Sequence, residues 1–233
     1  MTKQPRGTYL FIPRNFRPLR EEERRIVDEF HQLYYRLWDY SNGTGTIDLS
    51  WMGFHTLKCP MDMWTYQEIL FETKPDLIVE CGTRFGGSTA YLASLCDLLD
   101  RGRIVTIDID KRDGRPEHPR IRYIHGSSID PAVVADVRGG IAVGERVMVI
   151  LDSDHARDHV RAELDAWHDL VTRGCYLVVE DTNVNGHPVA ARHGPGPMEA
   201  AELFLADHPE FRVDELRERF LLTMNPHGWL LRS

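Results

Sequence analysis

The stretch LIVECGTRFGGS at residues 77–88 decides the fold. Its first five residues form a short apolar run without polar alternation, as expected for a parallel strand that is covered on both faces. A glycine-rich turn follows at once and leads into residues 88–99, which we expect to be a helix. Glycines allow a sharp backbone turn and a close approach to a ligand, and a helix start offers unpaired N–H groups. The alternative for this turn, taken alone, is a tight connection that binds nothing.

Strands and helices alternate on both sides of this stretch. Such a rhythm implies a parallel sheet with right-handed crossovers. The tail, residues 211–232, alternates strand-like runs around a turn near residues 225–228 and predicts a terminal hairpin. The expected fold is a doubly wound α/β domain over residues 51–233, with a mostly parallel, seven-stranded, Rossmann-like sheet. We expect strands at residues 77–81, 103–107, 121–125, 147–151 and 175–179, and helices at 62–73, 88–99, 158–172 and 198–206.

Residues 1–50 are predicted to form a helical extension before this domain. Residues 21–40 are rich in helix formers and carry apolar side chains at helical spacing. The aromatic face of this helix, Tyr34, Tyr35 and Trp38, can pack on the body, on a second subunit or on substrate, and packing on the body is the expected role. A turn-rich break follows at residues 41–45. The helix also favours a homo-oligomer.

Composition narrows the class of protein. The chain has 233 residues and a formal net charge of -8, which argues against nucleic acid because phosphate binding recruits a basic surface. No apolar run approaches the ~18 residues of a spanning helix, and the start does not read as a signal peptide, so no membrane association is expected. The four cysteines show no CxxC pairing, and three of them sit in apolar surroundings, where reduced, buried thiols are expected. These features predict a cytoplasmic protein.

The ends of the first three strands predict a nucleoside site, because ligands of such folds lie beyond the carboxyl ends of the strands. Asp108 follows the second strand, where an acidic side chain can accept both ribose hydroxyls, although alone it could equally cap a turn. The small polar residues of HGSS at 125–128 could contact an adenine edge. The loop is not Gly-x-Gly-x-x-Gly, because residue 84 is Arg and the later pair is Gly86-Gly87. This spacing disfavours a dinucleotide and suits a ligand without a pyrophosphate.

Acidic residues follow the fourth and fifth strands. The fourth strand ends in DSDH at residues 152–155 and the fifth in EDTN at residues 180–183. Carboxylates crowded at one sheet edge repel each other unless a cation or a proton intervenes. An oxygen-ligated ion such as Mg²⁺ meets that need. The alternative is helix capping by Asp152 and Asp154 with ordinary exposed acids after the fifth strand.

Together these motifs resemble the cephalosporin hydroxylase and rhamnosyl O-methyltransferase family of class I methyltransferases. The resemblance rests on E-x-G-x-x-x-G-G-S at residues 80–88, on Asp108, on DSDH and on Glu180-Asp181. The segments WMG (51–53), KCPMD (58–62) and YQE (66–68) look like the family's lead-in, and LTMNPHGWL (222–230) looks like its ending. The resemblance covers residues 50–232 and leaves the earlier residues outside it.

The resemblance implies a class I methyltransferase fold with S-adenosylmethionine (SAM) as cofactor and a Mg²⁺ site. By position, Glu80 and Gly82 flank the methionine part of SAM, Asp108 holds the ribose, and Ser127 or Ser128 lies by the adenine. The same motifs add to the expected cofactor contacts Thr83, Gly86, Ser88 and Asp152.

The resemblance also implies the metal ligands Asp152, Glu180 and Asp181, with Asp154 as the general base. Some family members have adjacent aspartates in place of Asp-Ser-Asp, so it stays open which of Asp152 and Asp154 binds the metal. His155 is a rival base, because its neutral form at cellular pH suits proton transfer.

We therefore expect a metal-dependent O-methyltransferase that acts on a hydroxyl of a small molecule, such as a sugar, a phenol or a natural-product intermediate. One alternative is a hydroxylase-associated, SAM-binding protein of natural-product tailoring, although a mononuclear iron site normally needs two histidines. Another is a non-catalytic SAM-binding module, which has no need for concentrated negative charge. Residues 183–197 are expected to be a long loop beside the metal site, where His187, Arg192 and His193 could meet substrate.

Overall fold

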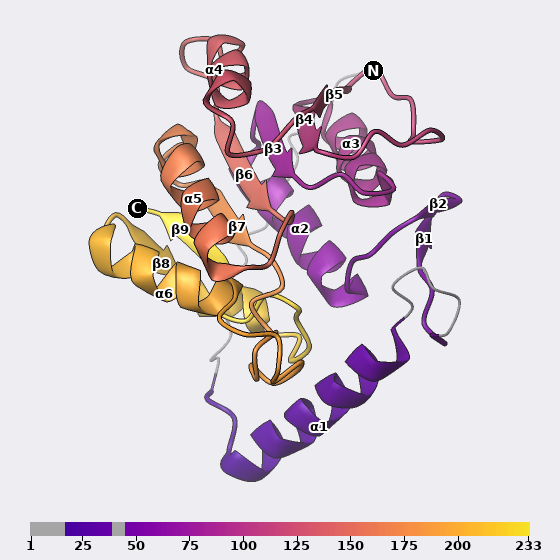
Figure 1. Cartoon of the computed structure of the whole chain (residues 1–233), viewed down its shortest axis with the longest axis vertical. Coiled ribbons are helices and arrows are strands. Elements are labelled where there is room, and N and C mark those ends of the chain that lie inside the picture. Colours follow the sequence, from indigo (N-terminus) through magenta and orange to yellow (C-terminus); the bar gives the residue numbers. More distant parts are fainter. Residues whose placement is uncertain (1–16, 39–44) are drawn as a thin grey trace, which may run out of the picture.

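The computed structural model describes residues 17–38 and 45–233, and a seven-stranded sheet lies at its centre (Figure 1). The strands follow the order β5-β4-β3-β6-β7-β9-β8, and all neighbours are parallel except that β9 is antiparallel to β7 and β8. The doubly wound, mostly parallel sheet is thus confirmed, and the five predicted parallel strands agree within one residue. They are β3 (Leu77–Cys81), β4 (Arg103–Asp108), β5 (Ile121–His125), β6 (Val147–Leu151) and β7 (Tyr176–Val179), followed by β8 (Phe211–Val213) and β9 (Trp229–Arg232).

Helices cover both faces of the sheet, as the uninterrupted burial of the central strands requires. Because strand side chains alternate, Val79 and Val149 contribute to one hydrophobic cluster and Ile78 and Met148 to the other. The first cluster includes α4 (Pro131–Gly139), α5 (Arg157–Trp167) and α6 (Pro197–Asp207). The second includes α2 (Pro60–Thr73) and α3 (Gly87–Leu99).

Three local features differ from the sequence-based expectations. Helix α4 was not predicted, although Asp130 caps it and Pro131 occupies its first turn. The hairpin of β1 (Ser50–Trp51) and β2 (Phe54–His55) was also not predicted, and its turn residues Met52 and Gly53 both have positive φ. The helix expected at residues 158–172 ends at Trp167 and continues as 3₁₀ turn His168–Leu170. A second 3₁₀ turn spans Glu215–Glu218.

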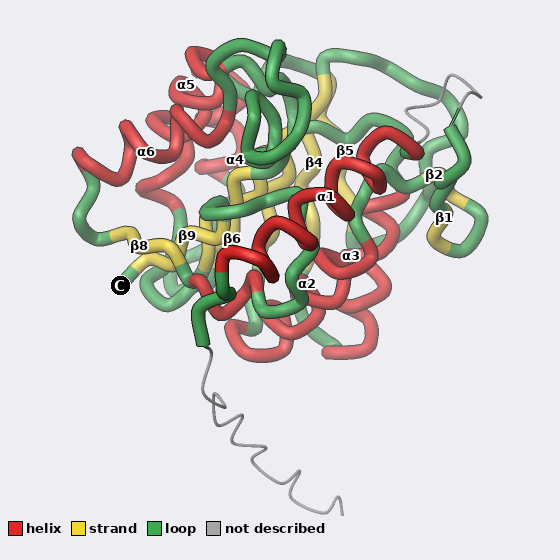
Figure 2. Tube along the Cα trace, turned by 90° about the horizontal axis from the view of Figure 1, so that it is seen from below, coloured by secondary structure: helices red, strands yellow, loops and turns green. Residues whose placement is uncertain are grey.

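Helix α1 (Glu21–Leu37) crosses the molecule on the side of the site described below (Figure 2). Trp38, just after the helix, is buried against Cys59, Leu222 and Met224, and Tyr34 and Tyr35 pack against this cluster. The expected packing of the aromatic face on the body is therefore confirmed.

Four further apolar side chains of α1 remain exposed, whereas Val27 is half-buried. They are Ile26, Phe30, Leu33 and Leu37. Tyr40 and most of the predicted break at residues 41–45 lie outside the described residues. No helix within residues 17–38 or 45–233 is long and apolar enough to cross a bilayer. All four cysteines are buried thiols, one more than the three for which this was expected.

Candidate active site

The glycine loop after β3 makes two close backbone approaches. Gly82 has φ +96°, and a Cβ there would lie 1.8 Å from the backbone oxygen of Asp152. A Cβ on Gly87 would lie 2.2 Å from the backbone oxygen of His55. Only glycine fits these positions, so the backbone of the loop packs directly against the end of β6 and against the β1–β2 hairpin.

Glu80 lies fully buried beneath this loop. Its carboxylate accepts hydrogen bonds from the hydroxyls of Ser88 at 2.8 Å, Thr89 at 2.5 Å and Thr106 at 2.7 Å. Burial raises the pKa of Glu80, while the charge of Lys58 and these hydroxyls oppose the shift. Glu80 therefore fixes the start of α3 from below. It does not line the cavity described below, whereas the predicted cofactor contacts Thr83, Gly86 and Ser88 do.

Asp108 at the end of β4 organises the same loop from the side. Its Oδ2 accepts from the backbone N–H groups of Thr83 at 3.2 Å and Arg84 at 2.7 Å, and it forms an ion pair with Arg115 at 2.8 Å. Its Oδ1 accepts from the N–H of Asp110. A ribose would therefore meet a carboxylate that already binds the loop, and Asp108 as a ribose ligand stays a prediction.

The two serines after β5 lie away from the cavity lining. The Ser127 hydroxyl accepts a bond from the N–H of Ile129 at 3.4 Å. Ser128 is buried, and its backbone oxygen accepts from the indole of Trp167. Their contact with an adenine stays a prediction.

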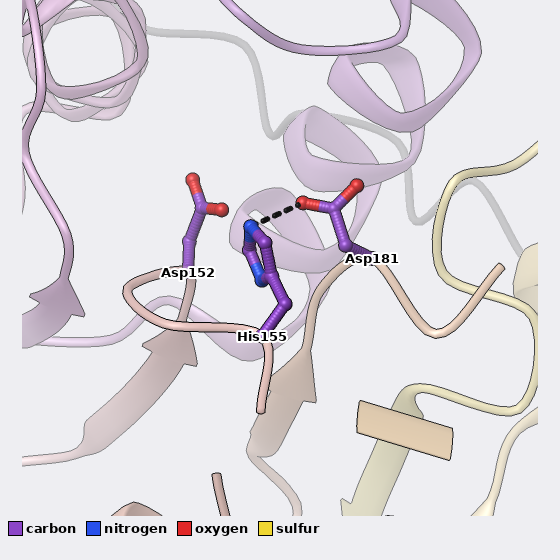
Figure 3. A group of neighbouring side chains, drawn as sticks. All are labelled: Asp152, His155 and Asp181. Atoms are coloured by element: carbon purple, nitrogen blue, oxygen red, sulfur yellow. Dashed lines mark ion pairs between the residues drawn. The ribbon is translucent and has the colours of Figure 1, made fainter. Parts of the chain in front are cut away.

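Asp152, His155 and Asp181 come together where β6 and β7 end (Figure 3). One potential ligand atom from each lies within 4.8 Å of the others, and His155 Nε2 lies 3.3 Å from Asp181 Oδ2. Burial raises the pKa of Asp152 to about 6, with Asp181 adding to the shift and Lys58 opposing it. Burial alone would lower the pKa of His155, but the charges of Asp181, Asp152 and Glu180 raise it. The cluster is electrostatically suited to a cation.

Glu180, the third predicted metal ligand, is buried and bound on both of its oxygens. Lys58 contacts Oε2, and the Tyr66 hydroxyl donates to Oε1 at 2.5 Å. The Lys58 ammonium also lies 2.5 Å from Asp152 Oδ2 and is only 6% exposed. Burial acts to lower the pKa of Lys58, but the charges of Asp152, Glu180 and Glu80 raise it.

Sequence reasoning missed Lys58 and Tyr66 as site residues. Both belong to the lead-in segments KCPMD and YQE, whose resemblance to the family was the only signal. Asp154, predicted as the base, lies outside the three-residue cluster. Its side chain is exposed, and its carboxylate accepts from the N–H of Ala156 at 2.7 Å.

A cavity of about 290 Å³ connects the glycine loop with the acidic cluster. The glycine loop, Asp152 and Ser153 contribute to its wall, as do residues of α1, the segment before α2 and the loop after β7. The expected position of the long loop beside the acidic cluster is confirmed through Val184 and His193, whereas His187 instead pairs with Glu199 at 2.8 Å. Among the described residues, the lining consists of Tyr35, Trp38, His55, Leu57, Cys59, Thr83, Arg84, Phe85, Gly86, Gly87, Ser88, Asp152, Ser153, His155, Asp181, Val184, His193 and Met224.

A buried side-chain hydrogen bond connects helix α1 to the loop after β7. Asn183 Nδ2 donates to His31 Nε2 at 2.9 Å, and burial lowers the pKa of His31 to about 4. Because the pKa of His31 in the folded protein lies below its ordinary value of 6.5, the neutral His31 contributes stability above pH 6.5. This contribution is lost as the pH falls toward 4.

We expect the contribution of His31 to fall by about 2 kcal/mol between about pH 7 and about pH 5. The protection factors of the α1 amides, which are exchange rates corrected for the pH dependence of intrinsic exchange, should therefore fall over this range in wild type. The control His31→Gln keeps an acceptor for Asn183 but does not titrate, so the protection factors of its α1 should change little. An equal fall of the protection factors in both proteins would contradict the role of His31 in holding α1.

The sheet order, the glycine loop after its first parallel strand and the acidic cluster at adjacent strand ends define a class I, Rossmann-like methyltransferase fold. The model of the rhamnosyl O-methyltransferase/CmcI family matches residues 44–233, and the chain belongs to that family. Membership confirms the predicted enzyme class, a methyltransferase.

Similar proteins include the rhamnosyl O-methyltransferase of Mycobacterium tuberculosis (strain ATCC 25618 / H37Rv), 37% identical over 217 residues, covering 89% of this chain and 85% of the relative. The rhamnosyl O-methyltransferase of Mycobacterium leprae (strain TN) is 38% identical over 214 residues, covering 89% and 91%. The apo structure of CmcI-N160 aligns with TM-score 0.61 and 25% identity, covering 79% and 76%. The Mg-SAM structure of CmcI-D160, at TM-score 0.62 and 22% identity, covers 85% and 83% and shows the shared fold.

Proposed function

We propose that this protein is a metal-dependent O-methyltransferase that moves the methyl group of SAM to a hydroxyl of a small molecule, with a sugar as the first candidate acceptor. The observation that carries the proposal is the Asp152–His155–Asp181 cluster, which opens onto the same cavity as the glycine loop. The names of the mycobacterial relatives support a sugar acceptor, and the Mg-SAM complex of CmcI-D160 supports Mg²⁺ together with SAM.

The residues present fit a divalent cation. Asp152 and Asp181 supply carboxylate oxygens at one point. Burial raises the pKa of Asp152, and the charge of Asp181 adds to the shift, an effect that a cation would offset. Glu180 is the third carboxylate of the proposed set, although it lies outside the three-residue cluster and its oxygens are bound by Lys58 and Tyr66. A bound divalent ion would lower the pKa of a coordinated acceptor hydroxyl and orient it.

The chain's own residues would then align the reactants and move the proton. Methyl transfer is an in-line displacement, so residues 83–88 must hold SAM opposite the acceptor hydroxyl across the cavity. We propose His155 Nε2 as the base, because it lies beside the carboxylates of Asp152 and Asp181, whereas Asp154 caps a turn. A cation held by Asp152 and Asp181 would offset their effect on the pKa of His155 and favour the neutral imidazole that a base needs.

We expect His155→Gln to lower kcat for methyl transfer to a methyl rhamnoside by roughly 100-fold or more while leaving the affinity for Mn²⁺ nearly unchanged. Turnover would be measured by mass spectrometry and Mn²⁺ affinity by electron paramagnetic resonance. If Mn²⁺ affinity collapses instead, His155 is a ligand and the base must be sought elsewhere. Asp154→Asn is the matched variant, and a comparable loss of kcat there would restore Asp154 as the base.

The alternative of a hydroxylase fits the donor set less well. The described residues bring one imidazole and two carboxylates together, whereas mononuclear iron sites of oxygenases normally use two histidines and one carboxylate. A homo-oligomer remains part of the proposal, supported by the exposed apolar side chains of α1, with sedimentation velocity as its measurement.

A further inference from the structure

The segment LTMNPHGWL at residues 222–230 resembles the family's ending, but nothing above gives it a role in the reaction. In the structure, residues 224–228 run alongside residues 179–183, the segment that carries Asp181. A Cβ on Gly228 would lie 2.1 Å from the backbone oxygen of Val179, so the two segments are in close backbone contact. Five hydrogen bonds join them: Val179 N to Gly228 O, Asp181 N to Asn225 Oδ1, Thr182 Oγ1 to Pro226 O, Asn183 N to Met224 O, and Asn183 Nδ2 to Met224 Sδ.

Asp181 is the strained residue within residues 179–183. Its φ of +54° lies in the left-handed region, which costs a non-glycine residue on the order of 1 kcal/mol and persists only where neighbouring structure holds it. The N–H of Asp181 donates to Asn225 Oδ1 at 3.0 Å, and Asn225 is only 1% exposed. The resulting turn places the Asp181 carboxylate 3.3 Å from His155 and in the same cluster as Asp152.

We propose that Asn225 is a positioning residue, which holds the backbone of Asp181 in the left-handed conformation and thereby aims its carboxylate into the cation site. The consequence for the metal rests on the proposed function, whereas the effect on the Asp181 backbone does not. Asn225 acts through a single acceptor oxygen, since its Nδ2 has no hydrogen-bond partner among the described residues. Asn225→Asp keeps the acceptor oxygen and loses no hydrogen bond, because the replaced Nδ2 has no partner among the described residues. Asn225→Ala removes the acceptor oxygen.

The test is the affinity of the full chain for Mn²⁺, measured by electron paramagnetic resonance, beside the affinity for SAM, measured by calorimetry. We expect Asn225→Ala to weaken Mn²⁺ binding roughly 10- to 100-fold, with a change in SAM affinity within about threefold, and Asn225→Asp to recover most of the loss. Thr182→Val is the control, because it removes a bond between the same two segments without touching the N–H of Asp181. Unchanged Mn²⁺ affinity in Asn225→Ala, or an equal loss in Thr182→Val, would overturn the proposal.

Hydrogen exchange at the Asp181 amide, measured by NMR in the metal-free protein, separates this inference from the proposed function. We expect faster exchange in Asn225→Ala than in wild type and Thr182→Val. If wild type binds no Mn²⁺, the proposed metal site fails, and the exchange rate still decides whether Asn225 holds Asp181. An Asp181 amide that is equally protected in Asn225→Ala and wild type would refute the positioning role.

Discussion

Replacing Gly82 by alanine is expected to destabilise the protein by about 4 kcal/mol or more, because two costs act together. The new Cβ would lie 1.8 Å from the backbone oxygen of Asp152, which cannot move without separating the ends of β3 and β6. The residue would also have to keep a φ of +96° that alanine rarely adopts. Denaturant unfolding in chelating buffer measures the free-energy change.

Gly144→Ala is the matched control for this experiment. Gly144 has a similar φ of +88°, but a Cβ there would meet nothing within 4 Å. Gly144→Ala should therefore lower the free energy of unfolding only by the conformational strain of its positive φ, about 1–2 kcal/mol. If both variants lose the same free energy of unfolding, the close approach of Gly82 to Asp152 does not carry the effect.

Replacing Lys58 by methionine is expected to lower the free energy of unfolding by about 3–5 kcal/mol, since it leaves buried carboxylates without their counter-charge. Methionine keeps most of the apolar stem, so the loss reports the ammonium that contacts Asp152 and Glu180. The free energy of unfolding would be measured in chelating buffer, where no added cation can replace the lost charge.

A double-mutant cycle tests the cause of the Lys58 effect. Glu180→Gln removes one of the carboxylates that Lys58 neutralises, so Lys58→Met should cost less in that background than in wild type. Strictly additive losses would show that Lys58 stabilises the fold through packing and not through its charge.

The sheet was predictable because its signals are local. The apolar run of β3, the glycine turn and the start of α3 are adjacent in the chain. Each central strand is likewise buried without alternation between buried and exposed residues. That Asp152 and Asp181 lie close together was also predictable, because each comes within two residues of the end of one of two neighbouring parallel strands.

The supporting contacts were not predictable, because they join residues that are far apart in the chain. Lys58 reaches Asp152 and Glu180 across 94 and 122 residues, and Asn225 reaches Asp181 across 44. No spacing rule connects such pairs. Asp108 illustrates the same limit: its place at a strand end was correct, but its bonds to the loop and to Arg115 depend on a tertiary arrangement that periodicity does not encode.

Metal-dependent methyl transfer is measured with isotopically labelled SAM and a methyl rhamnoside, in assays with Mg²⁺, with chelator, and with Mg²⁺ restored after chelation. We expect transfer of one labelled methyl group to the acceptor with Mg²⁺, a loss on the order of 100-fold or more with chelator, and full recovery on restoring the ion. Undiminished transfer in chelator would contradict the metal role of the Asp152–His155–Asp181 cluster. No transfer to the rhamnoside or to other sugar acceptors under any condition would contradict the proposed acceptor class.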